Sequence, residues 1–151
     1  KDDQIKAVGK NGGVINLNFF SGFVDSDFSR KNNEFREKHK PEIKALIESG
    51  MQGEYAMTQI ANKYKAESDA IKPDLEVLMQ HFDHIVKLIG IDHIGLGSDF
   101  DGIDSAPLQL KTVLDYPEFT NALIKRGYKD EDIAKVLGGN FLRVYRLNNP
   151  N

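Results

Sequence analysis

The sequence of 151 residues contains no cysteine, so neither a disulfide framework nor a thiolate metal site can form within it. Its acidic and basic residues nearly balance, and the net charge of −3 gives no electrostatic case for binding nucleic acid or anionic membranes. No apolar run approaches the roughly 20 residues that cross a bilayer. No signal-like segment opens the chain at Lys1, so we expect any targeting peptide to be absent or already removed.

The length and composition are those of one globular domain. A chain of this length can bury a core of its own, and 40% hydrophobic with 28% charged residues is an ordinary balance for a folded protein. The sequence shows no internal repeat and no low-complexity tract. We therefore treat residues 1–151 as a single unit.

The most informative stretch is His93 to Gly102, a short apolar strand that runs into two carboxylates and a glycine. Polar residues at the carboxyl end of a buried strand mark the active sites of parallel α/β folds. We therefore predict a catalytic or ligand role for Asp99 or Asp101, which share a face if the extended conformation continues. The alternative is that one of them only caps the turn before Gly102.

Other motifs could also contain such a segment. A calcium loop needs glycine at its sixth position and a late glutamate, but Gly102 comes fourth after Asp99 and no glutamate follows in time. A phosphatase of the haloacid dehalogenase type has an apolar strand that ends in Asp-x-Asp-Gly. In that family the strand stays apolar up to the first aspartate, whereas Gly97 and Ser98 intervene here, so the phosphatase remains only an alternative.

A second buried strand is predicted over residues 14–20, because its nearly continuous apolar character suits a parallel sheet. Asn16 and Asn18 interrupt it, and Asn18 is a candidate substrate contact. Only two strong strands are apparent, and a long helical segment separates them. We expect them to lie side by side and parallel, with outer edges that another copy or further strands must cover.

Residues 21–33 are predicted to form a polar loop. Beyond it, Pro41 and Gly50 bracket one helix, and a second is expected over residues 54–66. These helices, rich in lysine and glutamate, make up a helical insertion over about residues 34–70 that we expect to act as a lid or edge hairpin. Met57 and Tyr64 are expected to pack within it.

Further helices follow. Asp74 should cap a helix that continues to Gly90, Pro117 should begin another, and Asp130 should cap a third. A last helix over residues 140–147 is expected to bury Phe141, Leu142, Val144 and Tyr145.

The histidines are weak metal candidates. His81 and His84 lie three residues apart on one helix, close enough to hold a single ion. No third ligand stands at a readable spacing, and a zinc site needs three or four protein groups. We therefore expect them to bond neighbouring loops of the chain.

Separated stretches of the chain match one protein family in the same order. They are Gly12 to Ile15, Asn18 to Phe20, His81 to Ile85, Gly90 to Gly102, Tyr116 with Pro117, and Gly138 to Val144. Together they resemble the membrane (renal) dipeptidase family of zinc metallopeptidases. The resemblance implies a (β/α)8 barrel of the TIM type that is longer than this chain. It places residues 1–151 in the last two β/α units, as a single carboxyl-terminal fragment.

The same resemblance implies a function, which is the metal-dependent hydrolysis of dipeptides with two zinc ions. The family's metal ligands lie upstream of where this chain begins, so none can be assigned here. Asp99 matches a strand-end aspartate that handles the proton in metal-assisted hydrolysis. Gly102 matches a position whose backbone approaches the substrate, and Phe20 falls where the substrate pocket can carry a tyrosine.

Two hypotheses follow. In the first, the chain is the carboxyl-terminal part of a zinc dipeptidase and is catalytic only with the missing half of its barrel. In the second, the fragment folds alone or as a homo-oligomer and serves as a non-catalytic binding or structural module.

Overall fold

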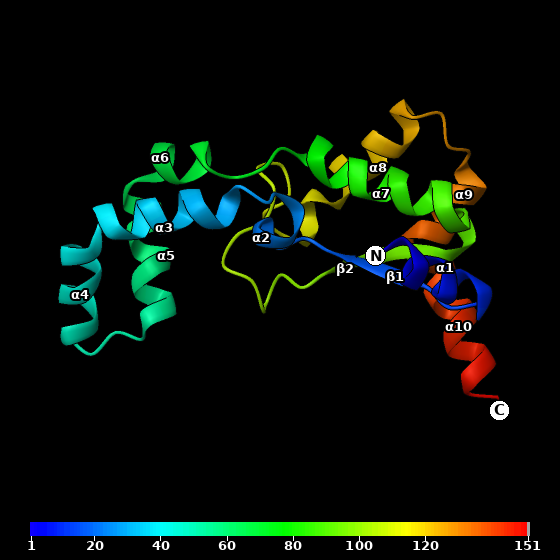
Figure 1. The fold of residues 1–151 in the computed structure, drawn as a ribbon, viewed down its shortest axis with the longest axis horizontal. Coiled ribbons are helices and arrows are strands. Elements are labelled where there is room, and N and C mark those ends of the chain that lie inside the picture. Colours follow the sequence, from blue (N-terminus) through cyan, green and yellow to red (C-terminus); the bar gives the residue numbers. More distant parts are fainter. Residues whose placement is uncertain (151) are drawn as a thin grey trace.

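The computed structural model describes residues 1–150 as an α/β chain that is mostly helical (Figure 1). Its sheet has two strands, β1 (Ile15–Asn18) and β2 (Ile94–Ser98). The α-helices are α1 (Asp2–Lys10), α2 (Ser21–Val24), α3 (Phe28–Lys38), α4 (Lys40–Glu48), α5 (Gly53–Lys63), α6 (Lys65–Ala70), α7 (Leu75–Ile89), α8 (Tyr116–Lys125), α9 (Asp130–Ala134) and α10 (Asn140–Asn148). Two short 3₁₀ segments, η1 (Ile91–His93) and η2 (Val113–Asp115), and a π-helical turn, η3 (Lys135–Gly139), complete the fold.

The two strands lie side by side and parallel, as the sequence predicts. Ile15 pairs with Ile94 at the start of the ladder, but at its end Asn18 pairs with Ser98, one residue later than the regular register. The extra residue on β2 is Gly97, so the sheet ends in a β-bulge. Bulges bend the strand that contains them and are common next to active sites. A Cβ at Gly95 would collide with the Oδ1 atom of Asn16, which explains why this strand needs glycine.

The main core lies between the sheet and helices α7 and α8. Its fully buried side chains include Phe19, Leu78, Met79, Phe82, Ile94, Leu110, Phe119 and Leu123. The ring of Phe19 stacks on Phe119 at 6.2 Å, so the end of β1 is anchored directly to α8. Burying a side chain of this size contributes roughly 1.5–3 kcal/mol. The helical periodicity after Asp74 is confirmed, and the Asp74 carboxylate caps α7 by accepting from the Glu76 N–H at 2.9 Å.

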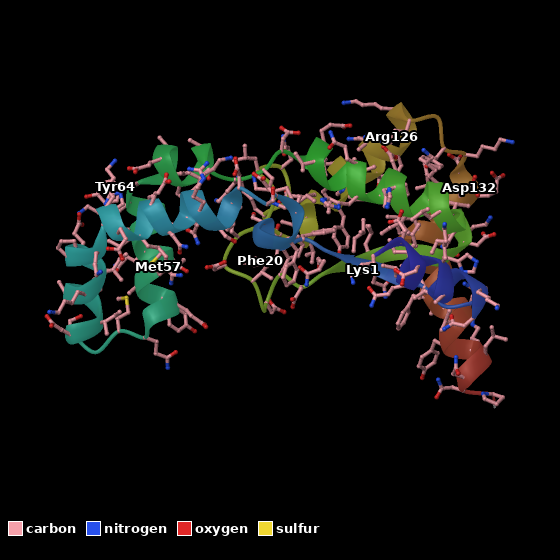
Figure 2. The ribbon with its side chains drawn as sticks, viewed as in Figure 1. Lys1, Phe20, Met57, Tyr64, Arg126 and Asp132 are labelled. Atoms are coloured by element: carbon pink, nitrogen blue, oxygen red, sulfur yellow. The ribbon has the colours of Figure 1, made fainter. Side chains whose placement is uncertain are left out.

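Helices α3 to α6, residues 28–70, form a helical arm at one end of the elongated molecule (Figure 1). The arm has its own small core of Phe35, Met57 and Ile60, and Met57 and Tyr64 both lie in it as expected (Figure 2). The His39 ring stacks on Tyr64 at 4.0 Å and packs this core further. The arm therefore does not depend on the sheet for its own packing.

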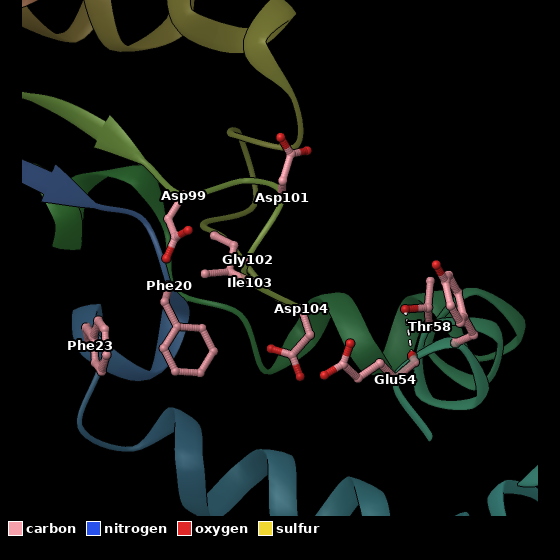
Figure 3. A pocket seen from close by; sticks show the side chains of 10 residues that line it. Phe20, Phe23, Glu54, Thr58, Asp99, Asp101, Gly102, Ile103 and Asp104 are labelled. Atoms are coloured by element: carbon pink, nitrogen blue, oxygen red, sulfur yellow. Dashed lines mark hydrogen bonds between the residues drawn. The ribbon is translucent and has the colours of Figure 1, made fainter. Parts of the chain in front are cut away.

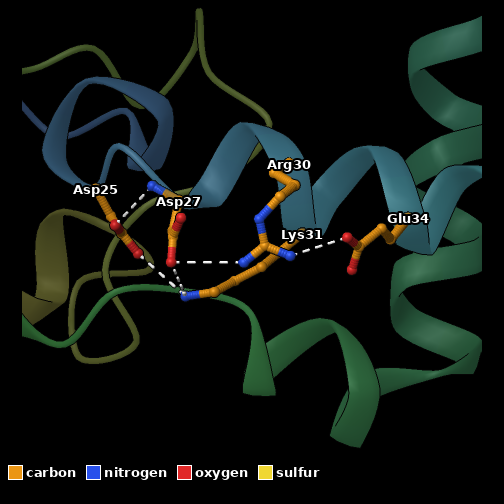
Figure 4. Close-up of polar contacts among 5 residues, drawn as sticks. All are labelled: Asp25, Asp27, Arg30, Lys31 and Glu34. Atoms are coloured by element: carbon orange, nitrogen blue, oxygen red, sulfur yellow. Dashed lines mark hydrogen bonds and ion pairs between the residues drawn. The ribbon is translucent and has the colours of Figure 1, made fainter.

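The prediction of a polar loop over residues 21–33 is wrong, because helix α2 and the first half of α3 occupy most of it. Phe28 and Phe35 are seven residues apart on α3 and both are buried, an apolar spacing that the surrounding charges conceal. Those charges form local pairs, including Arg30 with Glu34 at 2.9 Å and Lys31 with Asp25 at 3.5 Å (Figure 4). Ion pairs at or near the surface add little energy, so the buried rings stabilise this segment.

The expected buried side of the last helix is wrong for three of its four residues, while the fourth, Val144, is half-buried. Phe141, Leu142 and Tyr145 are 51%, 45% and 54% exposed, and Asn140 is the buried residue of α10. Periodicity identifies an apolar face but not the element that covers it, and within residues 1–150 no element covers this one. None of the helices in that range is long and apolar enough to cross a membrane.

Asp74 caps helix α7 as predicted, but the prediction that Asp130 caps its helix is wrong. Helices α1 and α9 begin at Asp2 and Asp130 themselves, so these carboxylates lie in the first turn and not at the capping position. A negative charge in the first turn still interacts favourably with the helix dipole.

Candidate functional site

A pocket of about 640 Å³ opens at the carboxyl ends of the two strands (Figure 3). Its lining residues come from three places: the end of β1 and α2, the segment after β2, and helix α5 of the arm. They are Phe20, Phe23, Glu54, Tyr55, Thr58, Asp99, Asp101, Gly102, Ile103 and Asp104. The volume is within the usual range for pockets that bind small molecules. Asp99, Gly102 and Phe20, all predicted site residues, are brought together here.

The backbone turns sharply where β2 ends. Ser98 and Asp99 have φ values of 46° and 70°, in the left-handed region that non-glycine residues rarely adopt. Each such residue costs about 1–3 kcal/mol and tends to occur at functional sites. The Gly102 N–H then donates to the Asp99 carbonyl oxygen at 2.9 Å and closes the turn. The strained pair therefore turns the Asp99 side chain out of the line of the strand.

This turn overturns the expectation that Asp99 and Asp101 share a face. The extended conformation stops at Ser98, so the two-residue alternation does not reach Asp101. Figure 3 shows the Asp101 carboxylate directed away from that of Asp99. The turn is closed by the backbone carbonyl oxygen of Asp99, a bond that any residue could make, and not by an aspartate side chain.

The Asp99 carboxylate lies between a hydrogen-bond donor and the backbone of Gly102. The Asn18 Nδ2 atom donates to its Oδ2 atom at 2.9 Å, across 81 positions of sequence. On the other side, a Cβ atom on Gly102 would lie 2.5 Å from its Oδ1 atom, so only glycine leaves room for it. Asn18 itself is not among the residues that line the pocket.

Phe20 forms an aromatic wall of the pocket. Its ring contacts Phe23 at 5.1 Å (Figure 3) and Phe28 at 6.2 Å, both edge to face, so it joins the end of β1 to the arm. A Cβ atom at Gly22 would lie 2.6 Å from the ring, so the lack of a side chain at Gly22 leaves room for the ring in this position.

Sequence reasoning missed the residues that α5 contributes. Glu54, Tyr55 and Thr58 precede β2 by about forty residues and carry no local signal that directs them to its end. Asp104 was also missed, although its position shortly after Asp101 in the same loop was a usable signal. Of the ten lining residues four are acidic and none is lysine, arginine or histidine, so the pocket is negatively charged.

His81 and His84 bond neighbouring segments, but their partners lie on helices α2 and α1 and not on the expected loops. His81 contacts the Val24 carbonyl at 2.8 Å, His84 contacts Asp2 at 2.8 Å, and His93 contacts the Gly13 carbonyl at 2.8 Å. Among residues 1–150, no three histidine, aspartate or glutamate side chains are grouped so that they could hold a metal ion.

Comparisons with known proteins agree on one family. A family model described as membrane dipeptidase (Peptidase family M19) matches residues 1–149. Dipeptidase tcpJ of Claviceps purpurea is 41% identical over 78 residues, which are 52% of this chain and 18% of the relative. Dipeptidase aclJ of Aspergillus oryzae is 39% identical over 88 residues, which are 58% of this chain and 21% of the relative.

Solved structures give the same result. The chain resembles the probable dipeptidase PvdM from Pseudomonas aeruginosa, with a TM-score of 0.61 and 28% identity over 94% of this chain and 38% of that one. It also shares its fold with the dipeptidase AC, a metallopeptidase of family M19, with a TM-score of 0.63 and 21% identity over 96% of this chain and 30% of that one. The matched region is therefore well under half of each of these proteins.

Proposed function

The chain belongs to the membrane dipeptidase family, and from this premise we propose that it supplies one part of the active site of a metal-dependent dipeptidase. The observation that supports this most is the position of Asp99. Its carboxylate lies at the carboxyl end of a parallel strand, on strained backbone, and lines a pocket of about 640 Å³. This is where barrel enzymes place their catalytic residues.

In this proposal Asp99 is the catalytic residue that moves the proton during peptide hydrolysis. A carboxylate that has a fixed position and borders the substrate pocket can take a proton from the attacking water and deliver it to the departing amine. Asp101 is directed elsewhere and makes a smaller contribution. The Asp99 side chain needs no further movement to reach the pocket, because the turn already presents it there.

Phe20 and Gly102 form the part of the substrate wall nearest to Asp99. Gly102 leaves the Asp99 carboxylate room beside its own backbone, so a dipeptide next to that carboxylate also borders Gly102. Phe20 has no hydroxyl, so it offers the substrate an apolar surface and no hydrogen bond. We place the scissile peptide between these residues and α5.

The remaining barrel strands come from outside these 151 residues. The two-stranded sheet has unpaired edges, and a cleft of about 250 Å³ lies along β1, lined in part by Ile15, Leu17 and Ile85. The apolar face of α10 is exposed as well. Parallel sheets are stable when both of their faces are covered, so a longer barrel would bury all three features. We therefore treat residues 1–151 as its last two β/α units, with the helical arm as an insertion.

The family is one of metallopeptidases, and among residues 1–150 no three histidine, aspartate or glutamate side chains are grouped so that they could hold its metal. We propose that two zinc ions are held by ligands from the rest of the barrel. When bound, zinc polarises the peptide carbonyl and makes water a better nucleophile. The match to the dipeptidase family over residues 1–149 also replaces the phosphatase alternative.

The test is a pair of variants in the complete barrel. Asp99→Asn should lower kcat for a simple dipeptide by at least about a hundredfold, since general acid and base groups typically contribute 10²–10⁴-fold. Zinc content should stay near normal, because Asp99 is not expected to be a metal ligand. Asp101→Asn is the matched control, with the same change two residues away and a smaller loss.

The outcomes separate the hypotheses. Loss of zinc on Asp99→Asn would make Asp99 a metal ligand. Full activity in both variants would mean that the strand-end site is assigned wrongly, and the non-catalytic binding or structural module would then be the better account.

A further inference from the structure

The side-chain amide of Asn18 can take only one orientation. The Phe20 backbone N–H donates to the Asn18 Oδ1 atom at 2.7 Å, and a backbone N–H cannot accept. The oxygen of the amide must therefore face Phe20, which leaves the Nδ2 atom to face Asp99. The contact at 2.9 Å is thus a donation from Asn18 to the Asp99 Oδ2 atom.

This donation makes the two oxygens of Asp99 unequal. The Oδ2 atom of Asp99 accepts a hydrogen bond from the Nδ2 atom of Asn18. Because Nδ2 can only donate, a proton on Oδ2 would have no acceptor there. Oδ1 lies on the Gly102 side, and among residues 1–150 the hydrogen bond to the Asp99 side chain goes to Oδ2 and not to Oδ1. Oδ1 is therefore the oxygen that remains available for chemistry.

The bulge at Gly97 makes the contact possible. In regular register Asn18 would pair with Gly97, but the extra residue brings it opposite Ser98, next to Asp99. The strained turn at Ser98 and Asp99 then directs the carboxylate toward the amide. These three features, the bulge, the turn and the fixed amide, all act on the same carboxylate.

We propose that Asn18 is a positioning residue that fixes the Asp99 carboxylate and reserves its Oδ1 atom for proton transfer. Oδ1 takes a proton from the attacking water as the new C–O bond forms, and gives it to the amine nitrogen as the C–N bond breaks, so the carboxylate is regenerated. This replaces the expectation that Asn18 contacts the substrate, and it fits the absence of Asn18 from the pocket lining. The inference rests on the proposed function of Asp99.

Two variants of Asn18 test it in the complete barrel. Asn18→Ala removes both hydrogen bonds, while Asn18→Asp can still accept from the Phe20 N–H but sets a carboxylate against Asp99. Both should lower kcat by on the order of 10- to 100-fold, the factor that corresponds to a hydrogen bond to a charged group. KM should be unchanged, because a positioning residue does not contact the substrate, whereas a substrate contact would raise KM. Asn18→Asp has the size of the natural residue, so it keeps the test valid if Asn18→Ala fails to fold.

Asn16→Ala is the matched control. Asn16 lies two residues earlier on the same strand and carries the same amide, but its Oδ1 atom lies over Gly95, and the amide that bonds the Asp99 side chain is that of Asn18. Its kcat should equal that of the unmodified protein.

A double-mutant cycle separates this inference from the proposed function. When Asp99 is already asparagine, Asn18→Asp should cause no further loss of kcat, because its effect passes through Asp99. If Asp99→Asn is inactive but both Asn18 variants keep normal kcat, or if the losses multiply, Asn18 does not position Asp99. If Asp99→Asn itself stays active, the proposed function fails first, and the role of Asn18 fails with it.

Discussion

The carboxylate of Asp99 fills the space that a side chain at Gly102 would need. A Cβ atom built on Gly102 would lie 2.5 Å from the Oδ1 atom of Asp99 and 3.2 Å from its Cγ atom. The φ angle of Gly102 is not in the left-handed region, so its backbone would tolerate an alanine. The reason for glycine at this position is therefore its contact with Asp99.

Gly102→Ala should consequently displace the Asp99 carboxylate without preventing the turn. We expect kcat in the complete barrel to fall by about a hundredfold, since a shift of about 1 Å in a catalytic group can cost that much. Steady-state kinetics with a simple dipeptide measures it. Gly53→Ala is the control, because a Cβ there meets only the Ile47 side chain, at 4.0 Å, and activity should not change. Equal activity of both variants would show that the Asp99 position is not critical.

The isolated chain should bind zinc no better than weakly and hydrolyse no dipeptide. A zinc site needs three or four correctly placed protein groups, and no such group of three is found among residues 1–150. The measurement is the zinc content of chelator-washed protein together with a dipeptidase assay. One zinc per chain, with turnover, would contradict the prediction and would show that residues 1–151 hold the metal themselves.

The isolated chain should also associate with itself or with the missing strands. The open edges of the sheet and the apolar side chains of α10, among them Phe141, Leu142 and Tyr145, are exposed. Light scattering coupled to size exclusion should detect species larger than one chain. Co-expression with the remainder of the barrel should return a defined complex. A stable monomer whose edge amides exchange slowly would argue against this view.

Asn140→Ala should destabilise the fold by about 1–3 kcal/mol, the cost of leaving a buried polar partner unsatisfied. The Asn140 amide donates to the Ile91 and Ile94 carbonyl oxygens at 2.7 and 2.8 Å, so it attaches α10 to the start of β2. Urea unfolding measures the change. Asn148→Ala on the same helix removes only an exposed bond to the Val144 carbonyl and should be nearly neutral. Comparable losses in the two variants would rule out a special role for Asn140.

Asp74→Ala should lower the free energy of unfolding by about 1 kcal/mol at pH 7, the usual value of a helix cap. Hydrogen bonds from the Glu76 N–H and then from Gln109 hold the pKa of Asp74 below its ordinary value. A lowered folded-state pKa means that this stabilisation is complete above the unfolded pKa of about 4 and is lost as the pH falls through the folded pKa. The difference in the free energy of unfolding between Asp74→Ala and the unmodified protein should therefore be smaller at pH 3 than at pH 7. A difference that does not depend on pH would leave the charge of Asp74 without a role.

Several features of the chain follow from its sequence because their causes are local. The helix after Asp74 depends on a cap and on apolar residues at helical spacing, and both act within a few turns. The two parallel strands follow from short apolar runs separated by a long helical segment. The family could also be identified, since its motifs are contiguous stretches of residues, and the match over residues 1–149 confirms it.

The arrangement of the site was decided by contacts between residues far apart in the sequence. The bond from Asn18 to Asp99 depends on a one-residue bulge in the register of β1 and β2, and no local pattern encodes the register of a parallel pair. The direction of Asp101 depends on left-handed backbone at two consecutive residues, Ser98 and Asp99, which is uncommon outside glycine and carries no signal in the local sequence. The wall from α5 and the exposure of α10 depend on how whole helices pack. A residue's spacing determines which face of an element it occupies, but only tertiary packing decides what that face meets.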